Sequence, residues 1–198
     1  MLRSKGFSIV EVIITITIIS VIGVFTSNLL TRTYRSSSDT ELLSKLKQNG
    51  EVASNNIGEA IRMADSVVCY GQNGLRNDRI VIRTIEGKYW LFRFVDPEPP
   101  TGSPVTKNGY ILKQENLNPR DFADFCIINP PNFSEDIIIT DFDNSSVTTG
   151  VSISQGNFVK SAGPAGKDTV TIKFDVGQAG LPPGSQGTVT VQTTVQVR

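Results

Sequence analysis

Apolar residues are distributed very unevenly along the 198-residue chain. From Phe7 to Leu30 the sequence is almost continuously apolar, and Glu11 is its only ionisable residue. As an α-helix this stretch would rise roughly 36 Å, enough to cross the hydrocarbon core of a bilayer, about 30 Å thick. The pattern predicts a membrane-spanning helix over residues 7–30. An unpaired carboxylate is costly in such a helix, so Glu11 should have a partner or a function.

An amphipathic pattern follows over residues 31–65. Apolar or small residues recur there near the 3.6-residue period of a helix. They are Leu42, Leu46, Ala53, Ile57, Ile61 and Ala64. We therefore expect one helix from Phe7 to about Ala64, with its second half packed on a globular domain. Gly50 and Gly58 lower the helix propensity and are the positions where we expect any kink or break.

The remainder, residues 66–198, alternates short β-branched or aromatic runs with turn residues. Residues 79–85 and 88–95 read as a β-hairpin that turns near Gly87, and residues 96–104 form a proline-rich loop. Further strands are predicted at residues 109–113, 124–128, 136–142, 151–155, 169–176 and 187–198. The expected fold is α+β, in which an antiparallel sheet domain buries one face on the amphipathic helix.

Charge and composition narrow the function. The chain has 19 basic and 19 acidic residues, so we predict no nucleic-acid surface, which requires a basic patch. It lacks histidine, the commonest general base and zinc ligand, and no nucleophile-base pair is evident. We predict no catalytic residues, no cofactor and no enzyme activity.

A metal site is also not predicted. Asp141, Asp143 and Ser145 alternate as in a calcium loop, but Ser146 and Ser152 occupy the places of the required glycine and bidentate glutamate. Asp136 is a further candidate carboxylate near this segment. A solvated turn is the better interpretation of these acidic residues.

The chain has two cysteines, Cys69 and Cys126, both beyond the apolar run. In an extracytoplasmic compartment they would most simply form one disulfide, worth roughly 3 to 4 kcal/mol in the chain-entropy model. In a cytosolic domain they would be buried free thiols. We expect the disulfide.

Four aromatic residues, Tyr89, Trp90, Phe92 and Phe94, lie close together in one predicted strand. Core packing is the simpler interpretation. An exposed aromatic patch would instead indicate a surface that binds a sugar or a partner.

The residues before the apolar run do not form an ordinary cleavable secretory signal. The run is longer than such signals have, and the first alanine of the chain is Ala53. Instead, a short basic leader ends at Gly6, Phe7 follows, and Glu11 stands at the fifth position after the junction. This arrangement resembles the processing site of type IV prepilins and type II secretion pseudopilins. The resemblance implies that prepilin peptidase removes residues 1–6 by cutting after Gly6 and methylates Phe7.

Cleavage after Gly6 would explain Glu11. The new amine on Phe7 would lie about 6 Å from Glu11 along the helix axis. In an assembly the amine of one subunit could neutralise Glu11 of its neighbour and so fix the axial register. The alternative is a polar residue near the end of an anchor that reaches the lipid headgroups.

The resemblance implies a structural subunit of a type IV pilus or type II secretion pseudopilus. Its partners would be other pilin-like subunits, prepilin peptidase, the inner-membrane assembly platform and, before assembly, membrane lipid. The N-terminus would be cytoplasmic and the β-rich domain extracytoplasmic. Asn28 replaces a proline that many pilins have, so a minor pilin or pseudopilin is at least as consistent as a major pilin. The alternative function is a membrane-anchored or pilus-tip adhesin.

Overall fold

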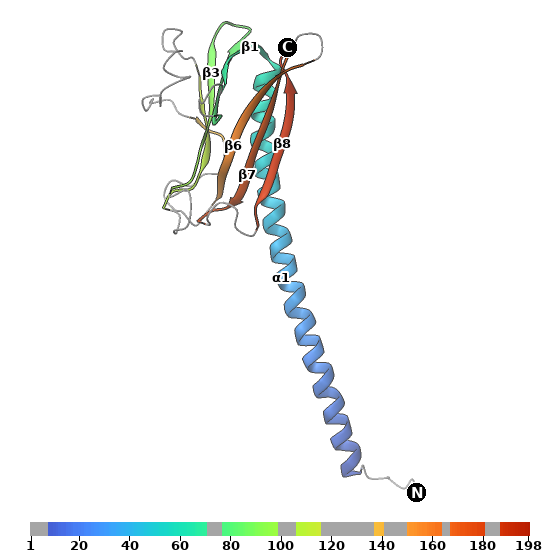
Figure 1. The fold of residues 1–198 in the computed structure, drawn as a ribbon. Coiled ribbons are helices and arrows are strands. Elements are labelled where there is room, and N and C mark those ends of the chain that lie inside the picture. The colour runs from blue at the N-terminus through green and yellow to red at the C-terminus, as the bar shows by residue number, and fades with distance from the viewer. Residues whose placement is uncertain are drawn as a thin grey trace. The chain divides into compact units, whose positions relative to one another are not determined.

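The structure is a computed structural model that describes residues 8–70, 77–98, 106–115, 137–140, 150–163, 167–180 and 187–198. One long helix is followed by two antiparallel sheets, which confirms the predicted α+β class (Figure 1). The chain divides into two compact units, Met1–Leu42 and Leu43–Arg198. The first contains only helix in its described part, and the second contains the end of that helix and all the strands.

The helix α1 (Ile9–Arg62) agrees closely with the predicted single helix. It runs through Gly50 and Gly58 without interruption, so the expected kink or break does not occur. Both glycines are buried. A Cβ on Gly50 would lie 2.5 Å from Val191 Cγ2, and one on Gly58 would lie 3.3 Å from Val195 Cγ2. The glycines therefore allow close approach of the sheet to the helix, and this packing offsets their low propensity.

In the part of the chain that the structure describes, the first sheet has five strands in chain order. They are β1 (Ala64–Tyr70), β2 (Arg79–Thr84), β3 (Tyr89–Val95), β4 (Tyr110–Gln114) and β5 (Ile137–Ile138). The predicted hairpin is confirmed as β2 and β3, with Gly87 at a positive φ of 77° in the turn. Strand β1 was not predicted. Strand β5 ends at Ile138, before the end of the strand predicted at residues 136–142, of which 136, 141 and 142 lie outside the described residues. The strand predicted at residues 124–128 lies outside the described residues.

The second sheet contains β6 (Val151–Ala162), β7 (Asp168–Gln178) and β8 (Val189–Gln196). Strand β6 continues well beyond the predicted end at Gln155. Its pairing with β7 shifts between Ser154 and Asn157, and Gln155 adopts a positive φ of 53°. This bulge lets one long strand continue past an irregular position that interrupts the sequence pattern.

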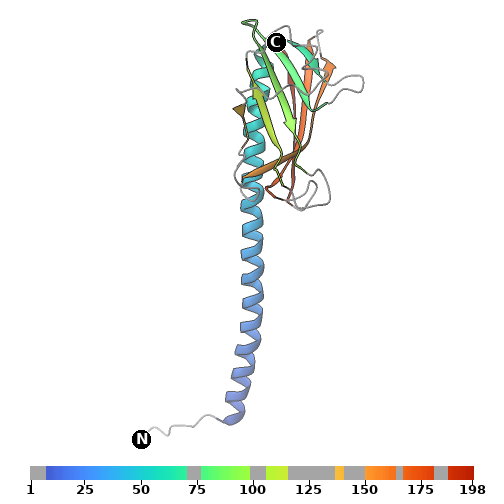
Figure 2. The ribbon, with the colours of Figure 1, turned by 90° about the vertical axis from the view of Figure 1, so that its left-hand side faces the viewer.

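The core of the second unit lies between the two sheets and the end of α1 (Figure 2). The Phe94 ring of the first sheet lies 4.7 Å from Phe158 and 5.4 Å from Phe174 of the second, measured between centroids. Phe92 is also buried, whereas Tyr89 and Trp90 are half-buried. The four aromatic residues therefore contribute mainly to packing and form no broad exposed patch. From the helix, Leu46, Ala53, Ile57 and Ile61 complete the core.

Candidate functional site

The candidate site is the N-terminal part of α1, which begins immediately after Ser8. The backbone N–H groups of Glu11 and Val12 both donate to the Ser8 carbonyl oxygen, at 3.0 and 3.2 Å. Glu11 therefore lies in the first helical turn. Ser8 and Glu11 also have the spacing of a capping box, in which the glutamate supports the start of the helix. The helix dipole favours a carboxylate at this end.

The surface of this segment is apolar on every side. All residues from 8 to 41 are exposed, including large apolar side chains around the whole helix. These are Ile9, Val10, Val12, Ile13, Ile14, Ile16, Ile18, Ile19, Val21, Ile22, Val24, Phe25, Leu29 and Leu30. A helix that is apolar all round belongs in a membrane or in the centre of an assembly. By length and composition, α1 can cross a membrane.

The hydroxyl groups of the segment bond to its own backbone. Thr15 donates to the Glu11 carbonyl at 2.7 Å, and Thr26 donates to the Ile22 carbonyl at 2.8 Å. The same four-residue contact is made by Thr17, Ser20, Thr31 and Thr33. These hydroxyls can therefore enter an apolar environment without losing their hydrogen bonds.

Glu11 differs from these residues. Its carboxylate is exposed, and no side chain within the described parts of the chain pairs with it. The next ionisable residue along the helix is Arg32, about 31 Å further along the axis. One charge thus stands at the beginning of an apolar length that matches a bilayer. Gly6 and Phe7, the predicted cleavage and methylation residues, lie outside the described residues.

This combination of features has a counterpart in a known family. The model of the prokaryotic N-terminal methylation motif matches residues 1–27. The chain carries the N-terminal signature of type IV pilins and pseudopilins. The signature marks structural proteins rather than a class of enzymes, and the apolar helix that follows it fits a membrane anchor. No curated protein sequence and no solved structure matches the chain.

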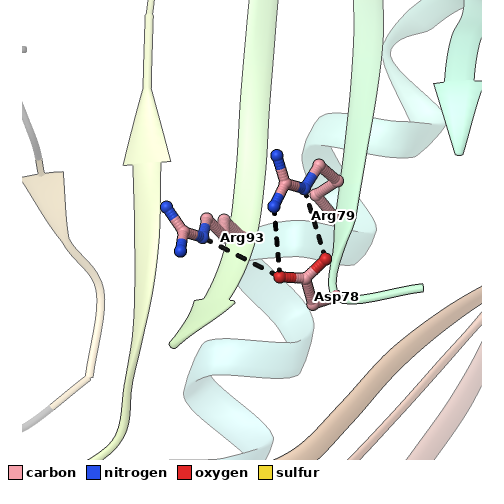
Figure 3. Close-up of polar contacts among 3 residues, drawn as sticks. All are labelled: Asp78, Arg79 and Arg93. Carbon is pink, nitrogen blue, oxygen red and sulfur yellow. Dashed lines mark hydrogen bonds and ion pairs between the residues drawn. The ribbon is translucent and has the colours of Figure 1, made fainter. Parts of the chain in front are cut away.

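The matched motif covers residues 1–27 and does not include the second unit. Among the described residues of the second unit, the most buried ionic cluster joins Asp78, Arg79 and Arg93 (Figure 3). Arg79 donates to Asp78 through Nε at 3.2 Å and Nη2 at 3.4 Å, and Arg93 Nε lies 3.9 Å from Asp78 Oδ2. The Arg79 side chain is only 4% exposed.

The two arginines of this cluster face each other in the sheet, since Arg79 pairs with Arg93 in the β2–β3 register. Like charges in opposite positions repel, and the carboxylate between them compensates for this. The cluster thus links β2 and β3 at the end of the hairpin away from its turn. It was not predicted from the sequence, although two arginines within otherwise apolar strands were a usable signal.

Only one cysteine of the predicted disulfide lies within the described residues. Cys69 lies half-buried on β1, and no cysteine in the described part of the chain has a free thiol. Cys126 lies outside the described residues, so the pairing of Cys69 with Cys126 stays a prediction. Asp136, Asp141 and Asp143 also lie outside them. Elsewhere in the described segments, Cys, Asp and Glu side chains form no group that could hold a metal ion.

Proposed function

We propose that this protein is the precursor of a structural subunit of a type IV pilus or type II secretion pseudopilus. Prepilin peptidase removes residues 1–6 by cutting after Gly6, and Phe7 becomes the methylated N-terminus. Residues 7–30 first anchor the subunit in membrane lipid and then form part of the filament core. The helix continues to Arg62, and the strands from Ala64 onward belong to the extracytoplasmic domain.

The observation that carries the proposal is the pairing of an all-round apolar helix with one carboxylate in its first turn. The exposed apolar side chains require an apolar surrounding, which either lipid or the helices of neighbouring subunits provide. The carboxylate of Glu11 requires a cation in that surrounding. The processed amine of Phe7 on a neighbouring subunit is positively charged and lies at a similar depth in the filament. Its pairing with Glu11 sets the axial register of assembly.

The other partners follow from this route. The inner-membrane assembly platform would receive the processed subunit, and other pilin-like subunits would surround it in the filament. The N-terminus would begin in the cytoplasm, and the β-rich domain would face the periplasm or the cell surface. The adhesin alternative gains no support from the aromatic strand, because Phe92 and Phe94 belong to the core.

Two substitutions at one position test the register role. Glu11→Val removes both the charge and the capping-box side chain, whereas Glu11→Gln removes the charge but keeps a side chain suited to the capping box. We expect both variants to insert in the membrane and both to be recovered in filaments at least about tenfold less than the wild type, because each leaves a neighbouring amine without its counter-charge. Recovery is measured by immunoblotting of sheared filaments against the membrane fraction.

Thr15→Val is the matched control, because it changes a polar residue one turn further along the same helix. Its hydroxyl bonds only within the helix, and this variant should assemble normally. If Glu11→Gln assembled as well as the wild type, Glu11 would act in helix capping and the register role would be wrong.

A further inference from the structure

Strand β8 forms one edge of its sheet. It pairs with β7 from Val189 to Gln196 without a register shift, and in the described part of the chain no strand pairs with its other edge. Its sequence, VTVQTTVQ, contains no charged residue and no proline. Thr190, Gln192 and Thr194 are exposed, whereas Val191 and Thr193 are half-buried on the opposite face.

Within the described residues, this edge lacks the usual protection against pairing with another chain. Exposed edge strands are normally short, bulged, charged or interrupted by proline. Strand β5 at the edge of the other sheet follows this rule with only two residues, and β6 carries a bulge. Strand β8 has eight regularly paired residues and none of these features.

A groove of about 290 Å³ runs beside this edge, within the second unit. One wall is formed by β8 residues 189–193, and the other by Lys47, Glu51, Ser54 and Asn55 of α1. Lys47 Nζ lies 3.8 Å from a Glu51 carboxylate oxygen, so the two charges on the helix wall offset each other. The groove is therefore close to neutral, and its lining combines polar side chains with Val189 and Val191.

We propose that β8 receives an extended, uncharged strand from a neighbouring pilin-like subunit, which lies in this groove and extends the sheet. The inference rests on the proposed function and names the contact between globular domains. Only another extended backbone offers donors and acceptors at the repeat of a strand edge. An uncharged strand fits this edge best, because β8 carries no charge and the charges of Lys47 and Glu51 on the helix wall offset each other.

Residue-resolved hydrogen exchange tests this contact. In a strand, alternate amides point to opposite edges, so the amides that face β7 are already protected in the free subunit. The full processed chain is compared in detergent and in purified filaments. We expect every second amide of residues 189–195 to exchange at least about tenfold more slowly in filaments, with the intervening amides unchanged.

A pair of variants adds a control. Thr193→Lys places a charge in the groove. Thr171→Lys makes the same change on β7, where Thr171 Oγ1 lies 3.0 Å from Thr194 Oγ1 on the outer face of the sheet. The Thr193 variant should lose the alternating protection, and the Thr171 variant should keep it.

Each other outcome has a clear meaning. Filaments in which the β8 amides exchange as fast as in detergent would overturn this inference and leave the proposed function intact. Alternating protection that already appears in detergent and grows with protein concentration would assign the edge to self-association outside the filament and also overturn the inference. Wild-type chains that never enter filaments would overturn both proposals.

Discussion

Gly50 of α1 and Val191 of β8 are so close that a methyl group on Gly50 would lie 2.5 Å from Val191 Cγ2. A second methyl, Val176 Cγ2, would lie 3.0 Å away. Glycine is a poor helix former, and alanine there would add up to about 1 kcal/mol of helix propensity. Overpacking typically costs about 1–3 kcal/mol, so the steric term should exceed the propensity term.

Gly50→Ala should therefore lower the free energy of unfolding of the second unit by up to about 2 kcal/mol. Denaturant titration of the full chain in detergent measures this, with the single tryptophan as the fluorescent probe. Gly58→Ala should cost less, because its methyl would lie 3.3 Å from one side chain only. Adding Val191→Ala to Gly50→Ala should recover part of the loss. A Gly50→Ala protein more stable than the wild type would contradict this packing.

The carboxylate of Asp78 should stabilise the end of the β2–β3 hairpin at which Arg79 and Arg93 lie. Asp78→Asn takes away the negative charge that lies between Arg79 and Arg93, and we expect a loss of roughly 3 kcal/mol. The control is Glu86→Gln, which breaks an exposed pair between Glu86 and Lys88 at 3.1 Å. That change should cost less than about 0.5 kcal/mol. Equal effects of the two substitutions in thermal unfolding would exclude a special role for the buried cluster.

The turn at Gly87 should depend on glycine for its backbone alone. Gly87 has a φ of 77°, and a Cβ added to it would meet no atom within 4 Å. Gly87→Ala should cost about 1 kcal/mol through backbone conformation, without any steric clash. Lys88→Ala, at the next position of the same turn, should be close to neutral in the same unfolding measurement. A neutral Gly87→Ala would show that the turn relaxes to another conformation.

The two cysteines should be joined in the mature protein. Oxidation of Cys69 and Cys126 to a disulfide removes two hydrogen atoms, so the intact mass should rise by about 2 Da on reduction. Alkylation should then label both residues only after reduction. Reduction should also lower stability by roughly 3 kcal/mol in the chain-entropy model. Quantitative alkylation of the unreduced native protein would contradict the predicted bond.

Local patterns explain which parts of the fold the sequence predicts well. The apolar run and the amphipathic repeat define α1, and the β2–β3 hairpin follows from two β-branched runs around a glycine turn. Strand β1 was not predicted for two reasons. The helical repeat extends to Ala64, where β1 begins, and the pairing of β1 with β2 shifts register twice. Neither feature produces a regular alternation of apolar and polar residues.

Contacts between distant segments were not readable in the same way. From the sequence alone, Gly50 and Gly58 are expected to weaken the helix. The structure shows that each lies against a valine of β8. The groove between β8 and the helix likewise depends on two segments far apart in the sequence. The candidate assembly site was different, because Glu11 and its apolar surroundings occupy one continuous stretch.

Mass spectrometry of the mature N-terminus, on protein purified from the membranes or filaments of its native host, tests the central claim most directly. The account predicts a chain that begins at Phe7 and carries one methyl group on its α-amine, with the rest of the sequence intact. A mature chain that still begins at Met1, or one cut near Gly23, would contradict it, because Glu11 would then have no processed amine to pair with on a neighbouring subunit.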